Sequence, residues 1–428
     1  MADLFDYLEW RGDISVSQVP LCEADYLVIG CFSYFPFDGI VPEYDVNMAS
    51  GSDGEKSELG LQRGNADGIN ETADCCGGDD RTYGIKLGDA VRRVIELCGP
   101  QGDGRNFHLK EDPQLAERLL DCTRYTELEI TDFVNIVDLE KEEQFSAFTL
   151  ILPDKSPLVV FRGTDKNMVG WKEDFNMAFN ETVPSQTDAL EYLRNAAEKF
   201  DGGIKICGHS KGGNLAIYSG AYVEHSIQDR ITEIWNLDGP GFLKDISPEN
   251  EFQSIIGRLH SFVPQLSVVG MLFEQAGDHN VVKSDGKGFW QHSLYTWKLR
   301  RSSLLIEPDV DKFSRKFSMI MKKWLLSLDY DRRQKLVEGV YGVTVEAGAR
   351  NVEDFKNFKT AYNLVISLGR LDDEMKSVLT DALKVFYKAM RSVSKAEREM
   401  RRLAKEEKTE ALPMLEDGDS EGENDTES

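Results

Sequence analysis

Residues 205–217 read KICGHSKGGNLAI, and this stretch decides how the middle of the chain should fold. A short apolar run leads to Ser210, which has glycines on both sides, and a helical pattern follows. The segment from Gly208 to Gly212 fits G-x-S-x-G, in which a serine occupies a strained turn between a strand and a helix. Such a turn exposes the serine Oγ beside a helix N-terminus, which favours developing negative charge. A structural glycine-rich turn is the alternative, but the flanking strand and helix favour a nucleophile.

Strand-like and helical patterns alternate around this turn. Apolar runs at 144–153 and 156–164 are separated by Asp154 and Lys155, which predicts a β-hairpin. Alternating strands and helices indicate βαβ units with helices on both faces of the sheet. We therefore expect an α/β protein with a mostly parallel sheet. The segments that follow the hairpin are a helix at 187–200, a strand at 204–208, a helix at 213–227 and strands at 231–237 and 258–264.

Composition changes along the chain predict five regions. One segment is rich in Gly, Asp, Asn and Ser and has few aromatic residues, which is typical of a disordered insertion. The final residues are acidic, with few apolar anchors, and are expected to be disordered as well. The expected regions are an N-terminal segment packing on the core (1–47), the insertion (48–82), the α/β core (83–305), a C-terminal helical region (306–408) and the acidic tail (409–428).

Charge and cysteine usage limit the partners and the location. The net charge of −25 repels nucleic acid, so we expect no nucleic-acid partner. No apolar run reaches the roughly 18 residues of a membrane span, and no secretory signal pattern opens the chain. The seven cysteines show no CxxC spacing, which favours reduced thiols in the cytoplasm over a disulfide framework or a metal site. No metal or organic cofactor is implied, and the sequence leaves the oligomeric state open.

A nucleophilic serine needs a histidine base, and the chain has only six histidines. In an α/β-hydrolase the triad follows the order Ser, Asp or Glu, His, which leaves the three histidines downstream of the helix after Ser210. His260 lies within an expected strand and suits a packed position, and His279 lies in a polar loop. His292 follows the last strand-like segment and is surrounded by aromatic residues that exclude water. We expect His292 to be the general base.

The carboxylate of such a triad is less well defined by the pattern. Asp238 ends the strand at 231–237 and opens the turn DGPG, where a carboxylate is well placed to hold an imidazole. A turn or capping role is the alternative for this residue. Glu274 and Asp278, on the loop towards His292, are the other candidates. Asp238 is the first choice.

An oxyanion hole needs two N–H donors. The backbone N–H of Lys211, directly after the serine, should be one. Thr164, at the strand end VFRGTD, is expected to supply the second from its N–H and hydroxyl. Arg162 in the same segment is expected to form a structural ion pair with Asp165 or Asp174.

The order of these motifs resembles two related families. VVFRGTD, GWKEDF, GHSKGG, NLDGPGF and QHSLYTW follow one another as the motifs of class 3 (fungal-type) lipases do. YLEWRGDIS, QFSA, GWKEDFNM, GHSKGGNLA and FVPQLSVVGML resemble the bacterial Mbeg-like family, a domain of unknown function related to the α/β-hydrolases. This second resemblance runs from about residue 3 to about residue 370.

The resemblance implies an α/β-hydrolase fold with additional N- and C-terminal helices. It also implies Ser210 as nucleophile, Thr164 as oxyanion residue and His292 as base. Class 3 lipases carry their aspartate in a D-x-V-P segment, and the matching stretch here begins with Ser267. The leading hypothesis is a serine hydrolase that cleaves an ester of a lipid or other small acyl compound. The alternative is a catalytically inactive hydrolase fold used as a binding or scaffolding module.

Overall fold

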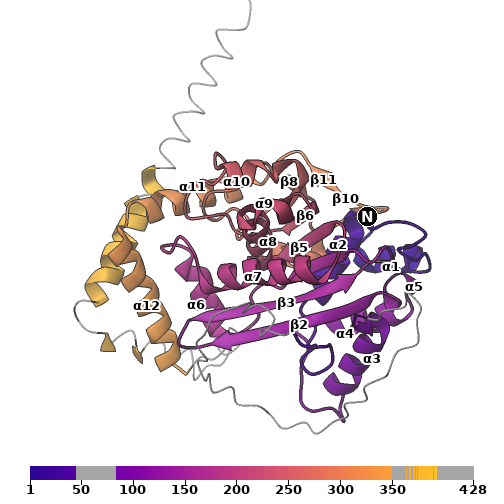
Figure 1. Cartoon of the computed structure of the whole chain (residues 1–428). Coiled ribbons are helices and arrows are strands. Elements are labelled where there is room, and N and C mark those ends of the chain that lie inside the picture. The colour runs from indigo at the N-terminus through magenta and orange to yellow at the C-terminus, as the bar shows by residue number, and fades with distance from the viewer. Residues whose placement is uncertain are drawn as a thin grey trace, which may run out of the picture.

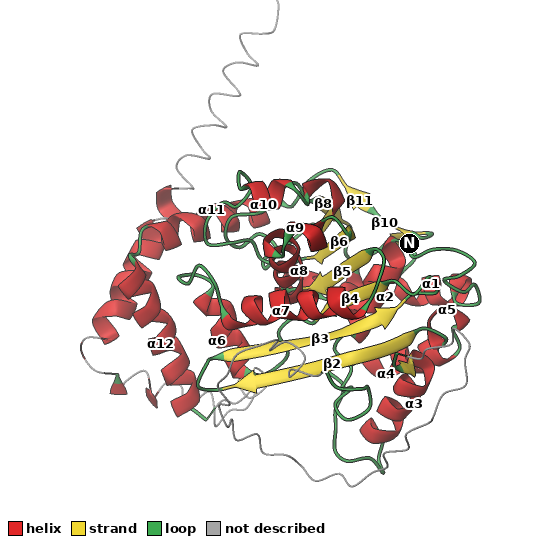
Figure 2. Cartoon of the chain, viewed as in Figure 1, coloured by secondary structure: helices red, strands yellow, loops and turns green. Residues whose placement is uncertain are grey.

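The computed structural model describes residues 1–44 and 83–348, and beyond these residues 363, 366, 367, 370, 371, 373, 375–388 and 390–392. The insertion expected at 48–82 and the tail expected at 409–428 lie outside the described residues. Within the described part, helices surround one large sheet (Figures 1 and 2).

Nine strands form the main sheet, in the order β1-β2-β3-β4-β5-β6-β7-β8-β11. The pairs from β4 to β8 are parallel, whereas β1 to β4 and the β8–β11 pair are antiparallel. A separate two-stranded ladder joins β9 to β10. The strands are β1 (Ile85–Lys86), β2 (Glu129–Asp138), β3 (Glu143–Ile151), β4 (Pro157–Phe161), β5 (Ile204–His209), β6 (Ile231–Leu237), β7 (Leu259–Pro264), β8 (Asn280–Val282), β9 (Leu299–Arg300), β10 (Ser303–Leu304) and β11 (Ile306–Glu307).

Helices occupy both faces of the sheet, and Figure 1 shows α7 and the α3–α4 pair on opposite sides of β2 and β3. The α-helices are α1 (Leu4–Arg11), α2 (Glu23–Phe32), α3 (Leu87–Cys98), α4 (Asp112–Leu120), α5 (Thr123–Thr126), α6 (Met168–Asn176), α7 (Pro184–Lys199), α8 (Lys211–Tyr222), α9 (His225–Gln228), α10 (Asn250–Gln253), α11 (Lys312–Leu326) and α12 (Tyr330–Glu346). Short 3-10 helices are η1 (Ile256–Arg258), η2 (Gly288–His292) and η3 (Leu294–Thr296).

Alternation along the central strands explains why both faces are covered. On β4, Val160 enters the core under α2 to α4, whereas Val159 and Phe161 enter the core under α7 and α8. On β5, Cys207 enters the core under α2 to α4, and Ile206 enters the core under α7 and α8. Successive strand residues point to opposite faces, so a strand that is apolar throughout needs a helical layer on each side.

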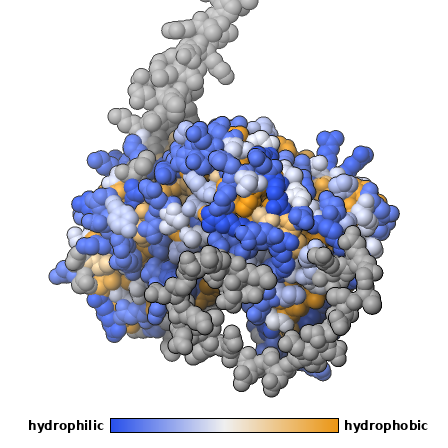
Figure 3. Space-filling view, in the orientation of Figure 1, coloured by the Kyte–Doolittle hydropathy of each residue, from blue (hydrophilic) through white to orange (hydrophobic). Residues whose placement is uncertain are grey.

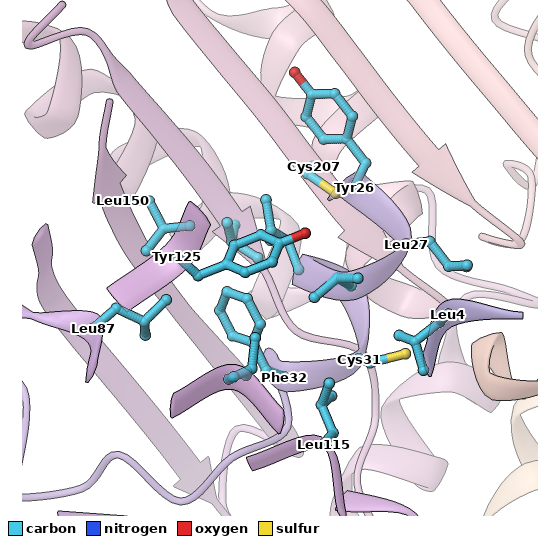
Figure 4. Close-up of a cluster of buried hydrophobic side chains, with 14 of the residues drawn as sticks. Leu4, Tyr26, Leu27, Cys31, Phe32, Leu87, Leu115, Tyr125, Leu150 and Cys207 are labelled. Atoms are coloured by element: carbon cyan, nitrogen blue, oxygen red, sulfur yellow. The ribbon is translucent and has the colours of Figure 1, made fainter. Parts of the chain in front are cut away.

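The N-terminal segment belongs to one of these layers. Helix α2 is buried along nearly its whole length, and Leu27 and Phe32 contribute to the cluster drawn in Figure 4. Tyr26 stacks on Trp235 of β6 with the ring centroids 4.0 Å apart. Each fully buried side chain of this size contributes about 1.5–3 kcal/mol to folding. The segment is therefore an integral part of the described structure.

The structure confirms the α/β class and the hairpin, since β3 and β4 pair antiparallel across Asp154 and Lys155. The expectation of a mostly parallel sheet holds for β4 to β8. Strands β2, β3 and β4 are joined by short turns that impose antiparallel pairing, and the edge strands β1 and β11 also pair antiparallel. Strand β11 also extends the sheet two residues beyond 305, where the core was expected to end.

The face shown in Figure 3 is mainly hydrophilic in its described part, with hydrophobic side chains in separate areas. Among the described residues, no helix combines the length and the hydropathy needed to cross a bilayer.

Candidate functional site

Ser210 lies between the end of β5 and the start of α8, in a backbone conformation that residues other than glycine rarely adopt. Its φ is 57° and its ψ is −131°. The Ser210 N–H donates to Leu237 O at 3.0 Å, and Ser210 O accepts from the Gly213 N–H at 2.8 Å. A strained residue held by its neighbours at a strand-to-helix turn is the geometry of a nucleophile elbow.

The glycines around Ser210 are required by close backbone approaches. A Cβ added to Gly208 would lie 2.0 Å from Gly212 O, and one added to Gly212 would lie 2.1 Å from Phe161 O. Gly163, on the neighbouring strand end, approaches the serine itself: a Cβ there would lie 2.8 Å from Ser210 Cβ. The two strand ends can converge at this point only because glycines occupy these positions.

Asp238 and His292 lie in direct contact beside this turn. His292 Nδ1 is 2.6 Å from Asp238 Oδ2, and the Asp238 side chain is fully buried whereas His292 is partly exposed. Asp238 follows β6, the strand next to β5, and has a positive φ of 54°. His292 ends η2, in the loop beyond β8. The contact fixes the imidazole with Nδ1 towards the carboxylate.

The second oxygen of Asp238 is held by residues after β7. Ser267 Oγ donates to Asp238 Oδ1 at 2.6 Å, and the Gly270 N–H lies 3.2 Å from the same oxygen. Ser267 is fully buried. The serine that stands where a carboxylate was expected therefore supports the carboxylate of Asp238.

The other candidate acids and bases lie elsewhere. Glu274 pairs with Lys322 at 2.9 Å, and Asp278 is exposed. His260 stacks on the Trp235 ring at 4.4 Å, which matches the packed position expected for it. Burial lowers the pKa of His279.

Thr164 and its neighbours form two separate contacts. Thr164 Oγ1 donates to Asp174 Oδ1 at 2.9 Å, and Arg162 Nη2 pairs with Asp165 Oδ2 at 3.2 Å. The expected ion pair of Arg162 is thus confirmed with Asp165. Burial is the main reason that the pKa of Asp174 is raised to about 6, while Lys211 and the Thr164 hydrogen bond lower it.

Lys211 directs its side chain into the protein rather than into solvent. Its Nζ pairs with Glu173 Oε2 at 2.6 Å and donates to Gln144 O at 2.6 Å. The side chains of Lys211 and Glu173 are 1% and 0% exposed. As the first residue of α8, Lys211 keeps a backbone N–H without a partner inside the helix, as an oxyanion donor requires.

His209 and Tyr34 also belong to the site, although no sequence pattern pointed to them. His209 Nε2 lies 3.0 Å from the carbonyl oxygen of His292, and His209 Nδ1 lies 2.8 Å from Tyr34 Oη. Because a carbonyl only accepts, Nε2 carries the proton and Nδ1 accepts from Tyr34. Burial, followed by the nearby His292, holds the pKa of His209 well below its usual value, so the ring is neutral. His209 therefore fixes the backbone of His292.

Within the described residues, no cluster of three or more His, Cys, Asp or Glu side chains is arranged to hold a metal ion. The structure does bring together a strained serine after β5, a carboxylate after β6 that contacts an imidazole from the loop beyond β8, and the N–H groups at the start of α8.

The fold and site thus define an α/β protein with a serine at a strand-to-helix turn beside a histidine–aspartate pair. The chain belongs to the Mbeg1-like family, whose model matches residues 119–342, more than half of the chain. The matched region contains the serine, the aspartate and the histidine, and it is narrower than the range from about 3 to 370 expected from the motifs. Neither the curated proteins nor the solved structures include a significant match.

Proposed function

We propose that this protein is a serine hydrolase with an α/β-hydrolase fold, related to class 3 lipases, that cleaves a carboxylic ester of a lipid or other small acyl compound. The observation that carries the proposal is the 2.6 Å contact between His292 Nδ1 and Asp238 Oδ2 beside the strained Ser210. The five cysteines of the described part are free thiols, which supports a cytoplasmic location.

In the proposed reaction, Ser210 Oγ attacks the ester carbonyl and His292 Nε2 takes its proton. Asp238 holds the imidazole and stabilises the imidazolium. The oxyanion of the tetrahedral intermediate accepts from the backbone N–H groups of Lys211 and Thr164. The imidazolium then protonates the leaving alcohol. Water, deprotonated by His292, attacks the acyl-enzyme and releases the acid and Ser210.

An inactive hydrolase fold that serves as a binding module is the second candidate. The observation that favours it is Ser267, which stands where class 3 lipases carry their aspartate. The hydrogen bond from Ser267 to Asp238 weighs against it, because it supports a buried carboxylate that contacts an imidazole, which is the arrangement that a hydrolase triad requires. The two candidates differ in the reactivity of Ser210.

A fluorophosphonate probe tests this difference. Wild-type protein should be labelled, because activated Ser210 Oγ displaces fluoride from phosphorus and forms a covalent ester. Ser210→Ala should abolish labelling, whereas Ser226→Ala, which changes an exposed serine on α9, should leave it intact. Folding of each variant is checked by circular dichroism. Folded wild-type protein that takes up no label would contradict the proposed enzyme and favour the binding module.

The position of His209 yields a second prediction. His209→Gln retains an amide N–H near the position of Nε2 and can still donate to the His292 carbonyl. His209→Asn is shorter, so it can meet only Tyr34. Displacement of a base by about 1 Å can cost up to about 10²-fold in rate. We therefore expect fluorophosphonate labelling to be at least about tenfold slower in His209→Asn than in His209→Gln. Equal rates would show that His209 does not position His292.

A further inference from the structure

A buried ion pair lies directly beneath the serine turn. Lys211 Nζ and Glu173 Oε2 are 2.6 Å apart, and the exposed fractions of the two side chains are 1% and 0%. Removing two charges from water is costly, so such a pair adds little stability compared with apolar residues of the same volume. Its presence next to Ser210 therefore points to a role other than stabilisation of the fold.

Glu173 joins the serine turn to two other elements. Besides Lys211, its Oε2 accepts from the Gln144 N–H at 3.0 Å, and its Oε1 accepts from the Ser185 N–H at 2.9 Å. Lys211 Nζ in turn donates to Gln144 O. Three backbone segments, namely the start of α8, β3 and the start of α7, are thus held by one carboxylate and one ammonium group. Hydrogen bonds to charged groups are stronger than neutral ones, so this junction is rigid.

The next residue of the same helix holds the other side of the site. Asp174 accepts from Thr164 Oγ1 at 2.9 Å. Adjacent residues of α6 therefore hold Lys211 and Thr164, the two residues whose N–H groups are the proposed oxyanion donors. Because an oxyanion hole requires donors within about 2.7–3.1 Å of one oxygen, the spacing between these two segments must be fixed closely.

We propose that the buried Lys211–Glu173 pair positions the oxyanion hole, with α6 setting the spacing between the Lys211 and Thr164 N–H groups. This inference rests on the proposed function and deepens it. The side chains of Lys211 and Glu173 are positioning groups: they act on the reaction through the backbone that they hold.

Asp174 provides a readout that depends on charge. Its pKa of about 6 is raised mainly by burial, is lowered by Lys211 and is raised by Glu173. Ionised Asp174 accepts from Thr164, so labelling should slow as the pH falls through this value. The charged and titratable groups that face Asp174 are Lys211 from α8, Glu173 on α6 itself, His292 from η2 and Tyr34 after α2.

The experiment measures fluorophosphonate labelling of the full chain, with the maximal rate constant (kinact) and the half-saturating concentration (KI) determined separately. Lys211→Met and Glu173→Gln should each lower kinact by about 10- to 100-fold. Displacing an N–H donor of the oxyanion hole can slow the reaction nearly as much as removing that donor. KI should change by less than about threefold, since probe binding uses other contacts. The matched control is Glu142→Gln, which removes the charge that Lys172 and Asn176 of the same helix contact and should leave kinact unchanged.

The pH profile gives a second readout, because the two variants remove opposite charges that act on Asp174. Loss of the Lys211 cation raises the pKa of Asp174, so the acid-side midpoint of kinact should move to higher pH in Lys211→Met. Loss of the Glu173 anion lowers the pKa of Asp174, so the midpoint should move to lower pH in Glu173→Gln. Midpoints that move in the same direction in both variants, or that stay unchanged in both, would overturn the proposal.

A double variant keeps the test decisive if a single variant fails to fold. Lys211→Met combined with Glu173→Gln leaves no unpaired buried charge, so its folding should recover relative to the single variants. We expect its kinact to stay low; recovery to the wild-type value would overturn the proposal. Failure of the proposed function is recognised separately: wild-type protein would then take up no label, or Ser210→Ala would still be labelled. Failure of the positioning role alone leaves wild-type labelling intact.

Discussion

Asp238→Asn should lower the rate of fluorophosphonate labelling by about 10³- to 10⁴-fold while the protein remains folded. Ser267 Oγ and the Gly270 N–H both donate to Asp238 Oδ1 and therefore fix that side of the group as the acceptor. In the variant, the amide oxygen takes this side and the NH₂ group faces His292. Since NH₂ only donates, His292 Nδ1 must accept, and its proton moves to Nε2. The imidazole then presents an N–H to Ser210 and cannot take the serine proton.

The matched controls are Glu274→Gln and Asp278→Asn, which alter the two other carboxylates that the sequence offered as candidates for the triad. Glu274 pairs with Lys322, and Asp278 is exposed, so neither variant should slow labelling by more than about twofold. Thermal melting of all three variants establishes that they fold. An Asp238→Asn variant that is labelled as fast as wild type would remove Asp238 from the triad. A large loss in either control would transfer the role to that residue.

The strands that carry the site were predictable from local pattern. Apolar runs of four to eight residues, bounded by polar turns, mark β4, β5 and β6, and the glycines around Ser210 mark the turn between β5 and α8. Strand β2 was not foreseen, because a bulge between Thr131 and Val134 interrupts its alternation. Local pattern revealed the pairing direction only for the β3–β4 hairpin, whereas the pairing of strands far apart in the sequence depends on contacts that it does not show.

The candidate site residues also differ in whether local pattern or only distant contacts reveal them. Asp238 and His292 could be proposed because chain order and strand ends restrict the choice, and the structure brings them into contact; their catalytic roles stay a prediction. Glu173 was missed because its partner Lys211 lies 38 residues away, with no local signal linking them. Ser267 was interpreted as a missing carboxylate, since only the three-dimensional arrangement shows that it donates to one.

Arg124→Met should lower the free energy of unfolding by about 3–5 kcal/mol, the cost of leaving a buried charge without its partner. Arg124 Nε and Nη2 contact both oxygens of Asp25, and the two side chains are fully buried. The guanidinium also donates to the carbonyl oxygens of Ile14, Val19 and Pro20. The variant would leave the Asp25 charge and three carbonyl groups without these donors. Urea denaturation, followed by tryptophan fluorescence, measures the change in the transition midpoint.

Two comparison variants make this prediction specific to the buried pair. Arg92→Ala removes an exposed ion pair with Asp89 and should hardly change the midpoint, because solvent screens such pairs. Asp25→Asn combined with Arg124→Met removes both buried charges and should recover part of the loss.

Arg124 lies within residues 119–342, which match the family model, whereas Asp25 lies on α2 outside that match. A wild-type midpoint in Arg124→Met would mean that the Arg124–Asp25 pair is not needed to hold the N-terminal segment. A lowered midpoint that recovers in the double variant would instead identify this ion pair as a specific bond between that segment and the family domain.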